Sequence, residues 1–316
     1  AADTGLPIEM NTANGGYYLF DNLPAGTFRV RVAASNWSAA NGALRGYSNS
    51  TGVTSLGSTF SAADNNRDHG TDPANAAAYA TAGVSSADIA LGTTTVGSGD
   101  TTEVGGNTGT PPTSTAGNAN DNLTIDFGFY RLSVGNLVWS DSGAGGGVYN
   151  DGIRNGTEPA LAGVGVQLID SLGNVVAQTI TDANGNYVFN QLSSAPAPTG
   201  TGSNLVYAAG VTNGQPILPG NYTVRIPANQ TVLSGATSSA DTANGRNTGD
   251  SQDNGVGTAF TTGNTDTSTF ALTPGSTLIG STPTDSNGTT DQPRIDFGFA
   301  PGFALGNRIW YDTNNN

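Results

Sequence analysis

Aspartates dominate the side chains of this sequence that could do chemistry. All but three of its 24 acidic residues are aspartates, its ten basic residues are all arginines, and it has no cysteine. The aspartates lie in segments rich in Asn, Gly and Ser, where carboxylates either bind Ca²⁺ or form hydrogen bonds within a turn. Both uses stay open for two sets of paired positions. These are Asp64 and Asp68 with Asp250 and Asp253, and Asp121 and Asp126 with Asp291 and Asp296.

Catalytic machinery is difficult to assemble from the remaining residues. The single histidine, His69, has Asn254 as its counterpart in the second half of the chain, so a polar loop residue is the simpler interpretation. No Ser-His-Asp motif is present, and the glycine run 143–147 lacks the lysine of a phosphate-binding loop. Aspartate pairs could serve a glycosidase, but in turns of this kind calcium binding or turn formation is the better interpretation. We therefore predict that the chain is not an enzyme.

The charge of the chain restricts its partners. The formal net charge is −14, and without lysine there is no basic patch to hold phosphates, so we expect no nucleic-acid partner. Anionic lipid headgroups would be repelled for the same reason. No apolar run approaches the roughly 18 residues that a membrane span needs, so we expect no membrane insertion of this segment.

The aspartate turns belong to a repeat of about 170 residues. The segment Ile125–Phe129 (IDFGF) recurs as Ile295–Phe299. Three further blocks recur: Val134–Trp139 as Leu305–Trp310, Gly16–Leu23 as Gly185–Leu192, and Gly26–Val32 as Gly220–Ile226. Four matched blocks indicate tandem copies of one module.

The blocks predict three divisions of the chain. Residues 1–131 form a repeat that lacks its first strands, residues 132–301 form a complete repeat, and residues 302–316 supply the first strand of a further repeat. Two interpretations of the incomplete repeats at the two ends stay open. The chain is a window in a longer array, or it is a unit that repeats along a fibre.

Each block has the pattern of a β-strand. Apolar Phe28, Val30 and Val32 alternate with arginines, which is typical of a sheet with one wet face, and residues 222, 224 and 226 alternate in the same way. The turn residues 172–174 between two apolar segments predict a hairpin. The alanine-rich segment 74–82 could form one helical turn, but no long segment has helical periodicity. We therefore predict an all-β protein of tandem immunoglobulin-like β-sandwich repeats with long loops.

The repeated blocks resemble the SdrD B-like repeats of bacterial surface proteins, which are relatives of Cna B-type and prealbumin-like domains. The resemblance rests on Gly-Asn-x-Val/Ile-Trp followed by an aspartate loop, Gly-x-Tyr-x-Phe-x-x-Leu, Pro-Gly-x-Tyr-x-Val and Asp-Phe-Gly-Phe. It implies an extracellular location at the bacterial cell surface and modules rigidified by calcium. Many Cna B-type domains carry a lysine–asparagine isopeptide bond, which this chain cannot form because it has no lysine.

The resemblance also implies a calcium loop after Trp139, with spacing like that of an EF-hand. The implied ligands are Asp141, Asp151, the carbonyl of Ile153, Asn155 and Glu158, and, in the third repeat, Asp312 and Asn314. An insertion, Gly143–Val148, departs from the family pattern and puts Tyr149 where an oxygen ligand is expected. Calcium is therefore the expected cofactor, at a loop that differs from the family form.

We predict a structural repeat protein of a bacterial cell-surface stalk or extracellular filament, rigidified by calcium and assembled end to end. The expected partners are copies of itself or neighbouring repeats, through strand pairing at Gly306–Tyr311, and other surface proteins or glycans. One alternative is an adhesin module that binds a host protein or glycan through its long loops, residues 33–120 and 193–218. Another is an accessory domain of a carbohydrate-active enzyme, and an exposed aromatic platform around Trp37 would favour such binding.

Overall fold

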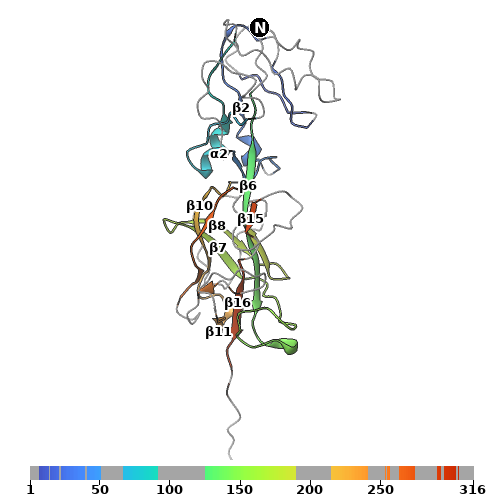
Figure 1. The fold of residues 1–316 in the computed structure, drawn as a ribbon, viewed down its shortest axis with the longest axis vertical. Helices are drawn as coiled ribbons and strands as arrows, with labels where there is room; N and C mark the ends of the chain where they lie inside the picture. Colours follow the sequence, from blue (N-terminus) through green and yellow to red (C-terminus); the bar gives the residue numbers. More distant parts are fainter. Residues whose placement is uncertain are drawn as a thin grey trace, which may run out of the picture. The chain divides into compact units, whose positions relative to one another are not determined.

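A computed structural model of the 316-residue chain shows two compact units, Ala1–Tyr130 and Arg131–Asn316. The structure describes residues 7–13, 15–20, 23–39, 41–50, 67–91, 125–189, 215–240, 253, 255–256, 263–274, 290–292, 295–303 and 305. Short β-strands account for most of the regular structure (Figure 1), which confirms the predicted all-β class. No helix among these residues is both long and apolar enough to cross a membrane.

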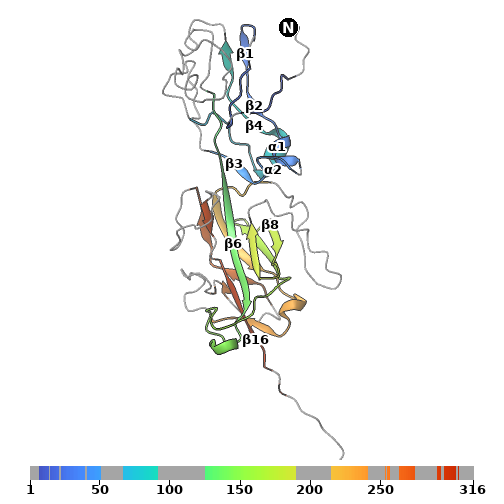
Figure 2. The same ribbon diagram turned by 90° about the vertical axis from the view of Figure 1, so that its right-hand side faces the viewer.

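Unit 2, Arg131–Asn316, is an immunoglobulin-like sandwich of two sheets (Figures 1 and 2). One sheet contains β7 (Gly165–Asp170), β8 (Val175–Ile180), β10 (Gly220–Ile226), β12 (Gly255–Val256), β13 (Thr265–Thr267) and β14 (Phe270–Leu272). The other contains β6 (Phe129–Ser140), β9 (Asn186–Phe189), β11 (Ala236–Ser238), β15 (Thr290–Gln292) and β16 (Phe297–Pro301). Short 3-10 turns occur at Ala144–Gly146 and Thr231–Leu233.

The core of unit 2 follows the apolar alternation of its strands. In β10 the side chains of Tyr222, Val224 and Ile226 are buried, and the polar side chains between them are partly exposed. The predicted hairpin around residues 172–174 is present, with β7 and β8 pairing antiparallel. The period-2 pattern therefore placed the buried face of these strands correctly, because successive side chains on a strand point to opposite faces.

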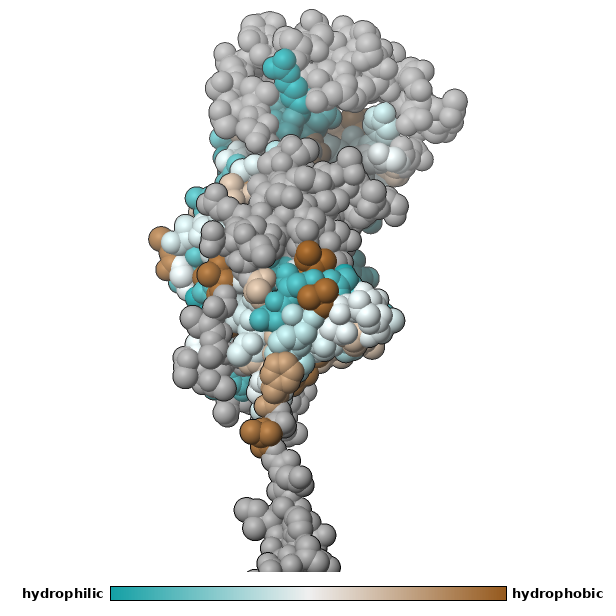
Figure 3. Space-filling view, turned by 60° about the horizontal axis from the view of Figure 1, so that its bottom comes forward, coloured by the Kyte–Doolittle hydropathy of each residue, from teal (hydrophilic) through white to brown (hydrophobic). Residues whose placement is uncertain are grey.

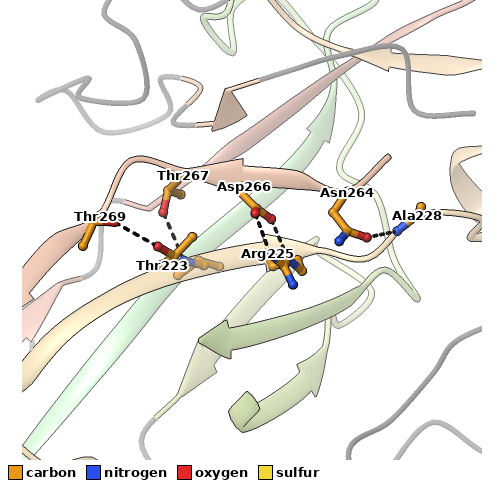
Figure 4. Close-up of polar contacts among 8 residues, drawn as sticks. Thr223, Arg225, Ala228, Asn264, Asp266, Thr267 and Thr269 are labelled. Atoms are coloured by element: carbon orange, nitrogen blue, oxygen red, sulfur yellow. Dashed lines mark hydrogen bonds and ion pairs between the residues drawn. The ribbon is translucent and has the colours of Figure 1, made fainter. Parts of the chain in front are cut away.

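Side-chain contacts fix β13 against β10 (Figure 4). Arg225 donates from Nε to Oδ1 of Asp266 and from Nη2 to Oδ2, both at 2.7 Å. The backbone N–H of Val224 donates to Thr267 Oγ1 at 3.0 Å. A two-point guanidinium–carboxylate contact selects one alignment of the strands, because a shift of one residue would turn the two side chains to opposite faces.

Unit 1, Ala1–Tyr130, contains shorter elements. They are β1 (Gly26–Phe28), β2 (Arg31–Val32), α1 (Ser35–Ser38), β3 (Tyr47–Asn49), α2 (Ala76–Ala82), β4 (Val84–Ser85) and β5 (Ile89–Leu91). β1 pairs with β5 and β2 with β4, both antiparallel. The alternating segment Phe28–Val32 is divided between two strands because the N–H of Val30 donates to the hydroxyl of Ser86, at 3.1 Å, and not to a backbone carbonyl.

Helix α2 and Trp37 form the apolar centre of this unit. The Asn75 side chain caps α2 by accepting from the N–H of Ala78 at 3.0 Å, so the alanine-rich segment makes more than a single turn. Trp37 is fully buried, its ring centroid lies 5.4 Å from that of Tyr79, and its indole N–H donates to the Tyr47 carbonyl at 2.8 Å. Trp37 is thus a core residue and does not provide the exposed aromatic platform that would have favoured glycan binding.

Candidate functional site

The loop after β6 brings together the first and last acids of the implied calcium loop. Asp141 is fully buried and Glu158 is 3 % exposed. Asp141 Oδ2 accepts from the N–H of Gly152 at 2.8 Å. Glu158 accepts from the N–H groups of Gly143 at 2.8 Å and Asn155 at 3.1 Å. These backbone donors fold the loop around two carboxyl groups that are separated by the inserted glycine-rich segment in sequence.

The two carboxyl groups interact electrostatically. Burial, and to a smaller extent the neighbouring Asp141 carboxylate, raise the pKa of Glu158, and the two backbone N–H donors only partly oppose this rise. Asp141 Oδ1 is buried and accepts no hydrogen bond from the residues that the structure describes. A buried carboxylate oxygen beside a second carboxyl group has to be stabilised by a proton, a cation or a bound water, because bulk solvent does not reach it.

The other implied ligands are engaged within the loop. Asp151 accepts from the N–H of Ile153 at 3.0 Å and from the Asn155 side-chain amide at 2.8 Å. Asn155 Oδ1 accepts from the N–H of Val148 at 2.9 Å. Tyr149, at the ligand position that the sequence made doubtful, donates its hydroxyl to the carbonyl of Pro301 at 2.8 Å. Among the described residues the implied side-chain ligands therefore form two pairs, Asp141 with Glu158 and Asp151 with Asn155.

No group of three or more His, Cys, Asp or Glu side chains in the described ranges is arranged to hold a metal ion. Calcium commonly takes six to eight oxygen ligands from carboxylates, carbonyls and water. Asp141 and Glu158 supply two carboxylates, and one buried oxygen of Asp141 accepts no hydrogen bond from the described residues. These ligands meet part of what a hard cation needs. Carbonyl groups and water would have to complete the shell.

The paired aspartates of the two repeats form the same turn, which we call the aspartate clamp. In unit 2, Asp253 Oδ1 accepts from the N–H of Gly255 at 2.9 Å and of Gly298 at 3.1 Å. In unit 1, Asp68 Oδ1 accepts from Gly70 at 2.9 Å and Gly128 at 3.1 Å. The clamp consists of Asp253 with Gly255 and Gly298, and of Asp68 with Gly70 and Gly128. Each joins a loop to the distant IDFGF block.

The second aspartate of each pair takes part in a hydrogen bond, through its carboxylate in unit 2 and through its backbone N–H in unit 1. Asp296 is fully buried, and its Oδ1 accepts from the N–H of Leu137 at 2.9 Å. In unit 1 the N–H of Asp126 donates to Nδ1 of His69, which is itself buried, at 3.1 Å. The contact of Asp296 gives its carboxylate a structural use in the sandwich that needs no metal ion, whereas the contact of Asp126 is made by its backbone.

Five of the candidate residues lie outside the described residues: Asp64, Asp121, Asp250, Asp312 and Asn314. For Asp291 the structure gives only the backbone pairing with Ser133, parallel to β6. Metal binding at these positions stays a prediction.

A repeated tyrosine contact was missed in the sequence. The Tyr187 hydroxyl donates to the Ile295 carbonyl at 2.5 Å, and the Tyr18 hydroxyl donates to the Ile125 carbonyl. Burial raises the pKa of both phenols, which stay neutral donors near pH 7. The recurrence of both tyrosines in the matched blocks was the available signal.

Without metal, the contribution of Glu158 to the stability of unit 2 is expected to fall as the pH rises above the ordinary glutamate pKa of 4.5. An acid whose pKa is raised by folding binds more protons folded than unfolded, so its contribution is complete below the unfolded pKa and is lost as the pH rises through the folded one. Thermal unfolding in EDTA from about pH 4 to about pH 8 measures this loss. The Glu158→Gln variant should lack this loss, so its stability relative to the parent chain should rise over this pH range, and identical profiles would contradict the raised pKa. The other carboxyl groups with shifted pKa values, Asp68 (raised) and Asp170 and Asp182 (lowered), are present in both proteins and cancel in the comparison.

Fold and contacts together define a tandem-repeat β-sandwich protein whose units share the aspartate clamp. Residues 132–197 match the family model of the SdrD B-like domain. The resemblance that the sequence predicted is therefore confirmed for this segment, and it is a repeat domain of surface proteins and not of an enzyme family.

Several staphylococcal proteins are similar to parts of the chain. Serine-aspartate repeat-containing protein F of Staphylococcus epidermidis is 45% identical over 80 residues, 24% of this chain and 4% of that protein. A fibrinogen-binding protein of Staphylococcus epidermidis is 42% identical over 80 residues, 24% of this chain and 7% of that protein. Serine-aspartate repeat-containing protein E of Staphylococcus aureus strain USA300 is 27% identical over 204 residues, 62% of this chain. The matches span 4% and 12% of the lengths of proteins F and E. These relatives confirm the predicted location at the bacterial cell surface.

Proposed function

We propose that this chain is a non-catalytic structural segment of a bacterial cell-surface stalk or extracellular filament, stiffened by calcium and assembled end to end. The observation that carries the proposal is the buried pair of Asp141 and Glu158, whose Asp141 Oδ1 has no donor in the described part of the chain. The shared clamp and the similarity to surface repeat proteins support the structural role.

A divalent cation solves the electrostatic problem of this pair better than a proton near neutral pH. A proton would neutralise one carboxyl group, whereas Ca²⁺ would balance both charges and accept Asp141 Oδ1 as a ligand. The net charge of −14 also favours cation binding over the whole molecule. Calcium would thereby link Asp141, at the end of β6, to Glu158, at the end of the loop. This link would restrict the motion of the loop relative to the strand.

Calcium is expected to raise the melting temperature of unit 2, because a ligand that binds only the folded state stabilises it by mass action. The gain is about 2.7 kcal/mol at a hundredfold excess over the dissociation constant. Calorimetry of the whole chain in EDTA and in calcium at pH 7 measures the shift. Asp141→Asn should lose most of it. Asp182→Asn, a change at an exposed turn aspartate, is the matched control and should keep it. Equal melting curves with and without calcium would refute the proposal.

An adhesin role is the second candidate, because one relative is named as fibrinogen-binding. Of the long loops considered for it, the described part of 33–120 contains the helices α1 and α2 and the strands β3, β4 and β5, so this range is not one loop. The range 193–218 lies outside the described residues except for 215–218. On the face in Figure 3 the apolar side chains form small patches between polar ones, which is ordinary for a protein surface. Saturable binding of the whole chain to immobilised fibrinogen would favour this role.

A further inference from the structure

Strand β8 forms one edge of the sheet that contains β7 and β10 in unit 2. The strands of this sheet follow the order β12, β13, β10, β7 and β8. Within the described ranges, β7 is the only strand that pairs with β8. An edge strand presents backbone N–H and C=O groups on its outer side, and these groups can bind another extended chain.

The contacts of β7 show which backbone groups of β8 face outward. The N–H of Gly165 donates to Gln230 Oε1 at 2.6 Å, and its carbonyl accepts from Gln230 Nε2 at 2.9 Å. Gln230 follows β10, so the backbone of Gly165 points away from β8. Opposite residues of an antiparallel pair point either toward each other or away from each other. Ile180, the partner of Gly165, therefore presents its N–H and carbonyl to the outer edge.

The next residue confirms this direction. The N–H of Thr181 donates to the carbonyl of Val164 at 2.9 Å, on the inner side of β8. Because backbone direction alternates along a strand, Ile180 and also Gln178 face outward. The outer edge thus offers two N–H groups and two carbonyls in regular spacing, which is the pattern that an added strand uses.

The composition of β8 leaves this edge open to pairing. The strand, Val175–Ile180, contains no charged residue and no proline, which are common means of blocking an edge. The register shifts at Val176, which has no partner on β7, so a bulge limits regular pairing to the part of β8 that follows it. The side chains of Gln178 and Ile180 are partly exposed and are available to contact an added strand.

Two carboxylates flank the edge. Asp170 precedes the turn that leads into β8, and Asp182 begins the turn that follows it. Burial acts to raise the pKa of Asp170, but hydrogen bonds from Asn174 and its neighbours outweigh it and lower the pKa. Hydrogen bonds from the N–H of Asn186 lower the pKa of Asp182. Both groups are therefore negatively charged at neutral pH, so basic groups at the ends of a bound strand would complement them.

A second copy of the chain complements this edge poorly. Antiparallel pairing of two β8 strands would bring Asp170 of each copy toward Asp182 of the other, and like charges repel. The net charge of −14 on each copy adds to the repulsion. The strand pairing that the sequence predicts at Gly306–Tyr311 falls outside the described residues and stays a prediction.

We propose that the outer edge of β8 binds an extended peptide segment with an uncharged centre and a basic residue at each end. Main-chain hydrogen bonds to Gln178 and Ile180 would hold the centre, and Asp170 and Asp182 would attract the ends. This binding site goes beyond the proposed stalk function, because it needs neither calcium nor end-to-end assembly.

A synthetic peptide tests the proposal. The probe has alternating valine and threonine in its centre, an arginine at each end and a fluorescent label, and its anisotropy is followed as the whole chain is added. Replacing both arginines by glutamate should weaken binding roughly tenfold or more at low salt. Methylating the peptide amides that face β8 should abolish binding, because it removes the N–H donors. No binding of the arginine peptide, or equal affinity for the glutamate peptide, would overturn the proposal.

Substitutions in the chain locate the site. Gln178→Pro removes an outward N–H and should weaken binding roughly tenfold or more, while a proline is tolerated on an edge strand whose N–H faces solvent. Gln178→Thr keeps the N–H and is the matched control, with unchanged affinity. Asp182→Asn should weaken binding and reduce its dependence on salt, since exposed charges are screened by ions. Unchanged binding by a folded Gln178→Pro variant would place the peptide elsewhere and overturn the proposal.

Hydrogen exchange of the unsubstituted chain tests the same contact without relying on a variant that folds. Added peptide should slow exchange of the N–H groups of Gln178 and Ile180 and leave that of Thr181, which is already bonded, nearly unchanged. Equal effects on all three would contradict pairing at this edge. Self-association of the chain that Gln178→Pro abolishes would assign the edge to a second copy and overturn the peptide proposal. All titrations are run in EDTA, so failure of the calcium proposal leaves them interpretable.

Discussion

Asp253→Ala is expected to destabilise unit 2 by about 2–5 kcal/mol, the largest effect of any single change that we consider. The variant removes an acceptor from the buried N–H groups of Gly255 and Gly298, which lie 2.9 and 3.1 Å from Asp253 Oδ1. An unsatisfied buried donor costs its full desolvation energy, and here two donors are affected. Denaturant unfolding of the whole chain, followed by the tryptophan fluorescence of unit 2, measures the loss.

Two matched variants test whether the stability loss of Asp253→Ala comes from its two lost hydrogen bonds. Asp253→Asn keeps one oxygen acceptor and should cost about half as much or less. Asp68→Ala makes the equivalent change in unit 1, where the clamp is only part-buried, and should have a smaller effect. The calcium shift of the melting temperature should survive in Asp253→Ala. Its disappearance there would mean that Asp253 is a metal ligand, and a cost below about 1 kcal/mol would contradict the clamp.

Gly298→Ala is expected to cost about 1–3 kcal/mol through overpacking. A Cβ at this position would lie 2.6 Å from Ser239 Oγ and 2.8 Å from Cζ2 of Trp139. Trp139 is fully buried, so its ring cannot move aside without disturbing the core. The same unfolding measurement reports the loss, and the near-ultraviolet circular dichroism of the tryptophan should change with it.

Gly220→Ala is the matched control for this change. A Cβ on Gly220 would meet nothing closer than 3.5 Å, which is ordinary van der Waals contact. Its stability should stay within about 0.5 kcal/mol of the parent chain. Equal losses in the two variants would show that alanine acts through the strand backbone and not through the contact with Trp139.

The sequence predicted the fold well where burial has a simple period. The alternation of Tyr222, Val224 and Ile226 located a core strand, and the turn at residues 172–174 located a hairpin. It did not predict the break between β1 and β2, because that break depends on the hydroxyl of Ser86, which lies far along the chain from Val30. Nor did it place Trp37, whose partners Tyr79 and Phe129 are brought to it by tertiary packing.

The candidate calcium loop shows the same limit. Family spacing nominated Asp141 and Glu158, and the structure buries both residues in one loop. Spacing could not show that Asp151 and Asn155 bond to each other, since their side-chain geometry depends on how the inserted Gly143–Val148 segment folds.

By itself the sequence determined the repeat, the all-β class and the resemblance to surface repeat modules, because strand periodicity and recurring motifs are local properties of the chain. Only the tertiary structure decided what the recurring acids do. Asp68 and Asp253 were equally consistent with calcium ligands and turn formers, and their two hydrogen bonds reach glycines that are far away in sequence.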